Sequence, residues 1–254
     1  MQILVRGSGP PLVMLHGWAM HGGIFAPLVA RLERHFQLHL VDLPGHGRSG
    51  DSVIPLQLDA VARFVAAQTP PAPWLGWSLG GLIALHAAQQ LPASVRGLVM
   101  LCASPRFVRV HDWPQGMADG IFRVFAEELG WDCAATIDRF LLIEAQGSDH
   151  PRDEIRLLRD QVFACGQPST LRLLEGLALL QDSDLRPGLP ALAMPSLWIA
   201  GCGDRLVSVH AMQLAAEQAQ GRFLGIEHGS HVPFLSHAGE VASAIIEFSE
   251  ALPA

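Results

Sequence analysis

The sequence predicts an α/β fold in which helices cover both faces of a mostly parallel β-sheet. Short apolar runs alternate with longer stretches of helical periodicity along most of the chain, as in sheets whose parallel strands are joined by helices. One long stretch, residues 106–186, shows helical periodicity and no convincing strand, and prolines interrupt it. We therefore expect a sheet domain built from residues 1–105 and 187–254, with a helical cap inserted between two of its strands.

The expected strands are short and rich in aliphatic residues. In chain order they span residues 2–6, 12–15, 38–41, 73–76, 97–102, 196–200 and 222–226. Helical patterns outside the cap cover residues 56–68, 79–90, 210–220 and 240–251. Ligands of such sheets gather at the carboxyl ends of the strands, so we expect the functional residues in the loops that follow strands.

Composition excludes several classes of protein. Of 254 residues, 50% are hydrophobic and 16% are charged, which predicts a large buried core. The net charge of −7 disfavours nucleic-acid binding. The chain contains no lysine, so Schiff-base chemistry and a phosphate-binding P-loop are excluded.

The sequence shows no signal for a membrane or for export. No apolar run approaches the roughly 18 to 20 residues that span a bilayer, and the first residues lack the pattern of a signal peptide. We expect a cytoplasmic monomer that contacts no membrane. The four cysteines, which form no CxxC pair, are expected to be free thiols: Cys102, Cys133, Cys165 and Cys202. We expect neither a metal nor a cofactor.

Ser78 is the candidate nucleophile. It lies in the pentapeptide GWSLG, between an expected strand and an expected helix, and matches the pattern G-x-S-x-G. A sharp strand-to-helix turn forces the serine into a strained conformation and exposes its hydroxyl above the sheet, while Gly76 and Gly80 relieve crowding. The alternative is a glycine-rich turn that contains an incidental serine.

A base and an acid follow in the chain order that this type of turn requires. Asp204 follows the strand SLWIAG, and His231 follows the last strand, so both lie just past the carboxyl end of a strand. His231 would accept the proton of Ser78, and Asp204 would orient the imidazole ring. His228 is the rival base, and the rival acids, for which a structural role is favoured, are Asp42, Asp182 and Asp184.

Two backbone N–H groups should stabilise the oxyanion that forms during acyl transfer. Leu79, the residue after the nucleophile, would supply one of them. Trp18 would supply the other, from the loop His16-Gly17-Trp18 after an early strand. The alternative for Trp18 is a packed aromatic role, and His16 is expected to have a structural role in the loop rather than to act as a second base.

These residues together resemble the α/β-hydrolase superfamily, as does VDLPGHGRS at 41–49, a stretch familiar from its esterase-like members. A closer resemblance extends over essentially the whole chain. LHGWAM, LHLVDLPGHGRS, WLGWSLGG, DRFLLIEAQGS and HVPFLSH are similar to the pimeloyl-[acyl-carrier protein] methyl ester esterases of biotin synthesis.

The resemblance implies a substrate and a contact set. The substrate would be a seven-carbon diacid chain, held at one end as a thioester of acyl-carrier protein and closed at the other as a methyl ester. Besides the catalytic Ser78, Asp204 and His231, the implied substrate contacts are Trp18, Leu79, Phe140, Leu141, Leu142, Ile143 and Glu144. Two positions depart from the family pattern. The resemblance implies Gln at position 144, where this chain has Glu144, and a basic residue near position 135, where it has Ala135.

Acyl-carrier proteins are acidic, so a docking site should be basic. Arg152, Arg156 and Arg159 have the spacing of one helix face, where the resemblance places docking residues, and Arg139 is a second candidate. The alternative is that these arginines simply pair with nearby acids at helical spacing: Asp149, Asp153 and Asp160.

The catalytic residues alone do not select the substrate. A general esterase for small esters, a lactonase or a carbon–carbon bond hydrolase would carry the same residues, and so would a ligand-sensing protein of this fold. Haloalkane and epoxide hydrolases are disfavoured because they would carry Asp in place of Ser78.

Overall fold

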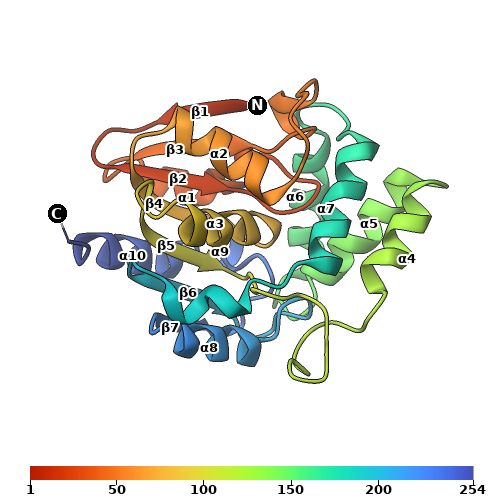
Figure 1. Cartoon of the computed structure of the whole chain (residues 1–254). Helices are drawn as coiled ribbons and strands as arrows, with labels where there is room; N and C mark the ends of the chain where they lie inside the picture. The colour runs from red at the N-terminus through yellow and green to blue at the C-terminus, as the bar shows by residue number, and fades with distance from the viewer. Residues whose placement is uncertain (254) are drawn as a thin grey trace.

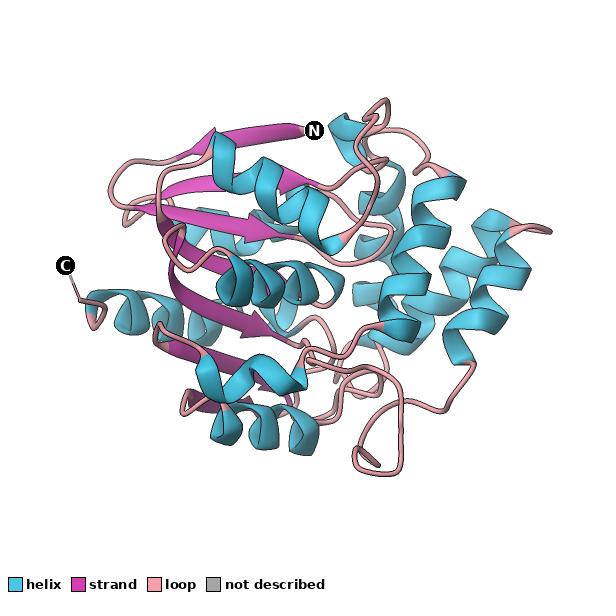
Figure 2. Ribbon diagram, in the orientation of Figure 1, coloured by secondary structure: helices cyan, strands magenta, loops and turns pink. Residues whose placement is uncertain are grey.

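A seven-stranded sheet forms the centre of the computed structural model, which describes residues 1–253 (Figures 1 and 2). The strands are β1 (Gln2–Arg6), β2 (Pro11–Leu15), β3 (Gln37–Asp42), β4 (Ala72–Trp77), β5 (Val95–Leu101), β6 (Ser196–Gly201) and β7 (Arg222–Ile226). Their order across the sheet is β1-β3-β2-β4-β5-β6-β7, and only the β1–β3 pair is antiparallel. The seven predicted strands are therefore all present, with ends that agree to within two residues.

The central strands are mainly apolar because both faces of the sheet are covered. Every residue of β4 and of β6 is buried, as expected for parallel strands between two helical layers. Helices α2 (Leu58–Gln68) and α3 (Leu79–Gln90) pack together on one face, and α1 (Ala26–Leu32) packs against α10 (Ala238–Glu250) on the other (Figure 1).

The remaining elements of the sheet domain are short. They are α8 (Val209–Gln218), α9 (Pro233–Ser236) and three 3₁₀ turns at Gly22–Phe25, Gly47–Ser49 and Arg186–Ala191. The predicted helices correspond to α2, α3, α8 and α10, whereas α1 and α9 were not predicted. Both of the unpredicted helices are short, with seven and four residues, and therefore show too few turns for a clear period.

Residues 106–186 supply no strand to the sheet and four helices that lie over the carboxyl ends of the strands (Figure 1). These helices are α4 (Ile121–Leu129), α5 (Cys133–Glu144), α6 (Pro151–Phe163) and α7 (Thr170–Asp182). That this segment acts as a cap stays a prediction.

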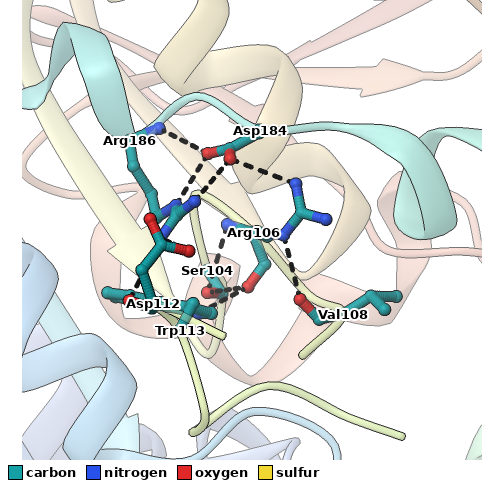
Figure 3. A network of polar contacts seen from close by, with 7 residues as sticks. All are labelled: Ser104, Arg106, Val108, Asp112, Trp113, Asp184 and Arg186. Carbon is teal, nitrogen blue, oxygen red and sulfur yellow. Dashed lines mark hydrogen bonds and ion pairs between the residues drawn. The ribbon is translucent and has the colours of Figure 1, made fainter. Parts of the chain in front are cut away.

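The two ends of this helical segment are fastened to each other (Figure 3). The backbone N–H of Leu185 donates to the carbonyl of Pro105 (2.9 Å), and Arg106 pairs with Asp184 (3.1 Å). Arg186 also pairs with Asp184, at 2.7 Å. Asp184, a rival acid in the sequence, is therefore engaged by two arginines where the helical segment joins the sheet domain.

The register of the sheet brings distant loops together. Leu15 lies opposite Gly76, so the loop after β2 is adjacent to the turn after β4. Gly201 lies opposite Ile226, so the loops after β6 and β7 are also neighbours. Within residues 1–253, no helix combines the length and apolar character needed to cross a bilayer.

Candidate active site

Ser78 occupies a strained turn between β4 and α3. Its backbone has φ 53° and ψ −120°, a conformation that a non-glycine residue adopts only when its surroundings impose it. The surroundings are crowded here, because a Cβ at Gly76 would lie 2.3 Å from the carbonyl oxygen of Gly80, and one at Gly80 would lie 2.3 Å from that of Leu15. The turn therefore needs glycine on both sides of the serine, as G-x-S-x-G supplies.

The structure brings Ser78, His231 and Asp204 into one chain of hydrogen bonds. The Oγ of Ser78 lies 2.8 Å from Nε2 of His231, and Nδ1 of His231 lies 2.7 Å from Oδ2 of Asp204. All three side chains are buried. With Nδ1 protonated, the ring donates to Asp204 and accepts the Ser78 hydroxyl, which is the arrangement that a general base requires.

Local contacts hold Asp204 in place and change the pKa of His231. The other oxygen of Asp204, Oδ1, accepts the backbone N–H groups of Leu206 (2.8 Å) and Val207 (2.9 Å). Burial works against a charge on the His231 ring, but the charge and hydrogen bond of Asp204, together with Glu144, raise the pKa of His231 above its ordinary value. The ring can therefore carry a proton while it remains inside the protein.

The loop after β2 lies against the nucleophile. A Cβ at Gly17 would be 3.2 Å from Cβ of Ser78, so this loop and the serine are in direct contact. Leu79 is the first residue of α3, where backbone N–H groups have no partner within the helix. The predicted oxyanion donors, Trp18 and Leu79, thus lie on the two segments that border Ser78.

His16, the first residue of this loop, has hydrogen bonds of a structural kind. Its Nδ1 lies 2.8 Å from the carbonyl oxygen of Gly17, and its Nε2 accepts the backbone N–H of Leu43. Burial, followed by the nearby His46, lowers the pKa of His16 to about 3, so the ring stays neutral. The hydrogen bonds of the ring therefore join this loop to the loop after β3.

The rival residues lie elsewhere. His228 is exposed and stands 3.8 Å from Asp149. Asp42 is buried and accepts the backbone N–H groups of Gly22 and Arg48, which is an anchoring role. Asp182 is exposed at the end of α7.

The cap residues that were predicted to contact substrate divide into two groups. Phe140 is buried with its ring centroid 4.6 Å from that of Trp18, whose Nε1 donates to the carbonyl of Leu173 (2.9 Å). Leu141 is also buried, and Ile143 is partly buried against the core. Leu142 is 48% exposed, so the structure does not bring it to the buried cluster.

Glu144 is a buried carboxyl at the end of α5. Neither of its carboxylate oxygens has a hydrogen-bond partner within residues 1–253. Burial raises the pKa of Glu144 to about 8; the nearby His231 lowers it and Asp204 raises it further. At neutral pH the group is therefore mainly an uncharged acid close to the catalytic pair.

Cys102 was not predicted as a site residue, yet it lies beside the acid and the base. Ligand atoms of Cys102, Asp204 and His231 all lie within 4.8 Å of one another. Burial, together with Asp204, strongly raises the pKa of the Cys102 thiol. A metal would need the thiolate and the Nδ1 position that Asp204 already occupies, so the set fits a metal poorly. Its position just after β5 was the only sequence signal.

The candidate docking arginines are all exposed, and three of them have acidic partners. Arg139 pairs with Glu128, Arg156 with Asp153 (3.1 Å) and Arg159 with Asp138 (3.0 Å). Of the three acids proposed as alternative partners, Asp153 alone is in such a pair. Arg152, Arg156 and Arg159 share the outer side of α6.

The fold and the site define an α/β hydrolase, and comparison with known proteins agrees. The model of the alpha/beta hydrolase family matches residues 12–244, so the chain belongs to this family. Among solved structures, the esterase EaEST from Exiguobacterium antarcticum is similar (TM-score 0.87, 23% identity, 98% of this chain and 95% of that chain). So is the enol-lactonase from Burkholderia xenovorans LB400 (TM-score 0.83, 18% identity, 97% and 95%).

Curated relatives are much closer in sequence. A pimeloyl-[acyl-carrier protein] methyl ester esterase from Stenotrophomonas maltophilia (strain R551-3) is 56% identical over 249 residues, covering 98% of this chain and 96% of the relative. Another protein of that name, from Xanthomonas oryzae pv. oryzae (strain MAFF 311018), is 54% identical over 254 residues and covers both chains completely. The similarity thus includes the cap helices as well as the sheet domain.

Proposed function

We propose that the protein is a serine carboxylesterase that removes the methyl group of pimeloyl-[acyl-carrier protein] methyl ester. The observation that carries the proposal is the buried hydrogen-bond chain from Ser78 through His231 to Asp204, in a fold that belongs to the hydrolases. The substrate follows from the relatives of that name, which match this chain over its whole length.

The geometry supports a two-step acyl transfer. Ser78 Oγ attacks the carbonyl carbon of the methyl ester while Nε2 of His231 takes the hydroxyl proton. The N–H groups of Trp18 and Leu79 stabilise the oxyanion. His231 then returns the proton to the departing methoxide, so that methanol leaves and the acyl group remains on Ser78 Oγ.

Water completes the reaction. His231 deprotonates a water molecule that attacks the acyl carbon, and the proton then returns to Ser78 as the free carboxylic acid leaves. Asp204 stays ionised and stabilises the imidazolium in both steps. No cofactor enters this sequence of steps.

The cap and the arginines supply selectivity in this proposal. Residues 106–186 form the cap, and Phe140 with Trp18 lines the acyl site. Arg139, Arg152, Arg156 and Arg159 form a basic surface for the acidic carrier protein. Small esters that reach Ser78 without a carrier are hydrolysed by the same residues.

A comparison of two substrates tests the proposal. We expect kcat/KM for pimeloyl methyl ester on its carrier protein to exceed that for an aryl ester of similar acyl length by at least about tenfold, because carrier contacts add binding that a small ester lacks. Free carboxylate on the carrier, measured by mass spectrometry, reports the first reaction, and the released phenol reports the second. An equal or reversed ratio would assign the protein to the general esterases.

A further inference from the structure

His231 is held by the cap as well as by the sheet domain. Its backbone N–H donates to the carbonyl oxygen of Glu144 at the end of α5 (3.2 Å). Its own carbonyl accepts Nε1–H of Trp77, at the end of β4 (2.9 Å). The peptide units on both sides of the imidazole are therefore fixed, one by the cap and one by the sheet.

A second contact joins the cap to the residue before the histidine. The hydroxyl of Ser230 donates to Oε2 of Glu154 on α6 (2.8 Å) and accepts the backbone N–H of Val232 (3.3 Å). Both Ser230 and Glu154 are buried, so this bond is shielded from water. It spans 76 residues of sequence and connects the cap to the loop that carries His231.

Glu154 faces inward for a simple reason of helix geometry. Glu154, Leu158 and Val162 are spaced four residues apart and form the buried side of α6. The other side carries Arg152, Arg156 and Arg159. The same helix thus presents arginines to solvent and a carboxyl to the histidine loop.

Access to Ser78 requires this arrangement to change. Ser78, Leu79, Trp18 and His231 have no exposed surface in the structure. A substrate therefore reaches the hydroxyl only when residues packed around it move, and the cap helices contribute Phe140 and Leu173 to that packing. Movement of the cap would break its contacts with the histidine loop.

We propose that Glu154 and Ser230 are a positioning pair through which the seated cap holds His231 in line with Ser78. Their role rests on the proposed function, since it takes His231 as the base. Misplacing a catalytic group by about 1 Å can cost about 100-fold in rate, so a contact that fixes the loop acts on turnover more than on substrate binding. Turnover is then efficient only with the cap closed over the substrate.

Four variants test the positioning pair, with hydrolysis of a short aryl ester as the readout. Ser230→Ala and Glu154→Ala each remove the bond and should lower kcat by about 5- to 50-fold with KM within about twofold. The double variant should lose no more than either single variant, because both break one interaction. Glu154→Gln keeps an oxygen that accepts the Ser230 hydroxyl and should retain most of kcat.

Glu175→Ala is the matched control. Glu175 on α7 accepts the backbone N–H of Leu56 (2.8 Å), so it also joins the cap to the sheet domain, but away from the histidine. This variant should keep kcat within about twofold of the wild type. The downfield proton NMR signal of His231 Nδ1–H should weaken or move in Ser230→Ala and Glu154→Ala and stay in place in Glu175→Ala.

The pair has no positioning role if Ser230→Ala and Glu154→Ala keep the wild-type kcat and Nδ1–H signal. It has no specific role if Glu175→Ala lowers kcat as much as they do. An aryl ester needs neither the pimeloyl chain nor the carrier, so the result is independent of the substrate assignment. Ser78→Ala tests the proposed mechanism separately from the positioning pair. Turnover by that variant would show that Ser78 is not the nucleophile.

Discussion

Residues at the site differ in how firmly their surroundings hold them. Ser78 is held by backbone strain and by two glycines, and Asp204 is held by two backbone N–H groups. In the described part of the chain Glu144 has no such partners, and burial leaves it as an uncharged acid near His231. This carboxyl should therefore influence stability more than the chemistry of the ester.

The free energy of unfolding should depend on pH through Glu144. Its pKa is raised to about 8 in the folded protein and is ordinary in the unfolded chain. Between these two values the folded state keeps a proton that the unfolded state releases, so stability falls as pH rises, by about 1.4 kcal/mol for each pH unit. Above about pH 8 this contribution is lost.

Glu144→Gln should remove this dependence. The difference in unfolding free energy, variant minus wild type, should increase by about 3 kcal/mol from pH 5 to pH 7.5. Urea unfolding at the two pH values measures the difference, and Glu127→Gln, a change of an exposed glutamate on α4, is the control. A constant difference between wild type and Glu144→Gln at both pH values would show that Glu144 is ionised in the folded protein.

At the scale of elements, α6 has two distinct faces. Its inner side reaches Ser230 through Glu154, and its outer side carries three exposed arginines. Arg156 and Arg159 already pair with acids, so these pairs must open or be shared when an acidic partner binds. Exposed ion pairs are worth at most about 1 kcal/mol, so this exchange is inexpensive.

Charge reversal on this face should weaken the carrier-linked reaction selectively. Arg152→Glu with Arg156→Glu should raise KM for the carrier-linked ester by about tenfold or more at low salt, while kinetics with an aryl ester stay unchanged. Added salt should shrink the effect because the charges are exposed. Arg63→Glu on α2, which breaks an exposed pair with Asp59, is the matched control. An unchanged KM for the carrier-linked ester at low salt would place the carrier on another face, and an equal loss with both substrates would show that the substitutions disturb the fold.

Features encoded by neighbouring residues could be predicted from the sequence, whereas contacts between distant residues could not. The turn around Ser78 is encoded by five adjacent residues, and the strands that end before Asp204 and His231 are apolar runs. These three residues could therefore be predicted from short stretches of the sequence. The contact between Glu154 and Ser230 joins an unremarkable glutamate to a loop serine 76 residues away. No periodicity marks such a pair.

Helix phase accounts for further differences. The stretch from Phe140 to Glu144 was expected to contact substrate as a unit, but a helix turns successive side chains by 100°, and Leu142 faces solvent. Arg159 pairs with Asp138 on the neighbouring helix and with none of the three acids expected at helical spacing, because packing of α5 against α6 brings the two helices together.

For the whole molecule, a sheet domain supplies the reacting groups and a helical segment encloses them. The segment leaves and rejoins the sheet at one place, where Arg106, Asp184 and Arg186 bind its two ends together (Figure 3). It then contacts the histidine loop at a second place, through Glu144 and Glu154. In the proposed closure of the helical segment over the substrate, the first attachment would stay in place and the second would form when the segment closes.

The central claim is that Ser78 is the nucleophile activated by His231, and covalent labelling tests it most directly. A fluorophosphonate reacts with an activated serine and leaves a stable adduct that mass spectrometry can locate. We expect one adduct per chain, on Ser78, with activity lost in proportion to labelling, and a folded Ser78→Ala variant that neither reacts nor hydrolyses esters. An adduct on another residue that abolishes activity, or normal turnover by Ser78→Ala, would contradict the account.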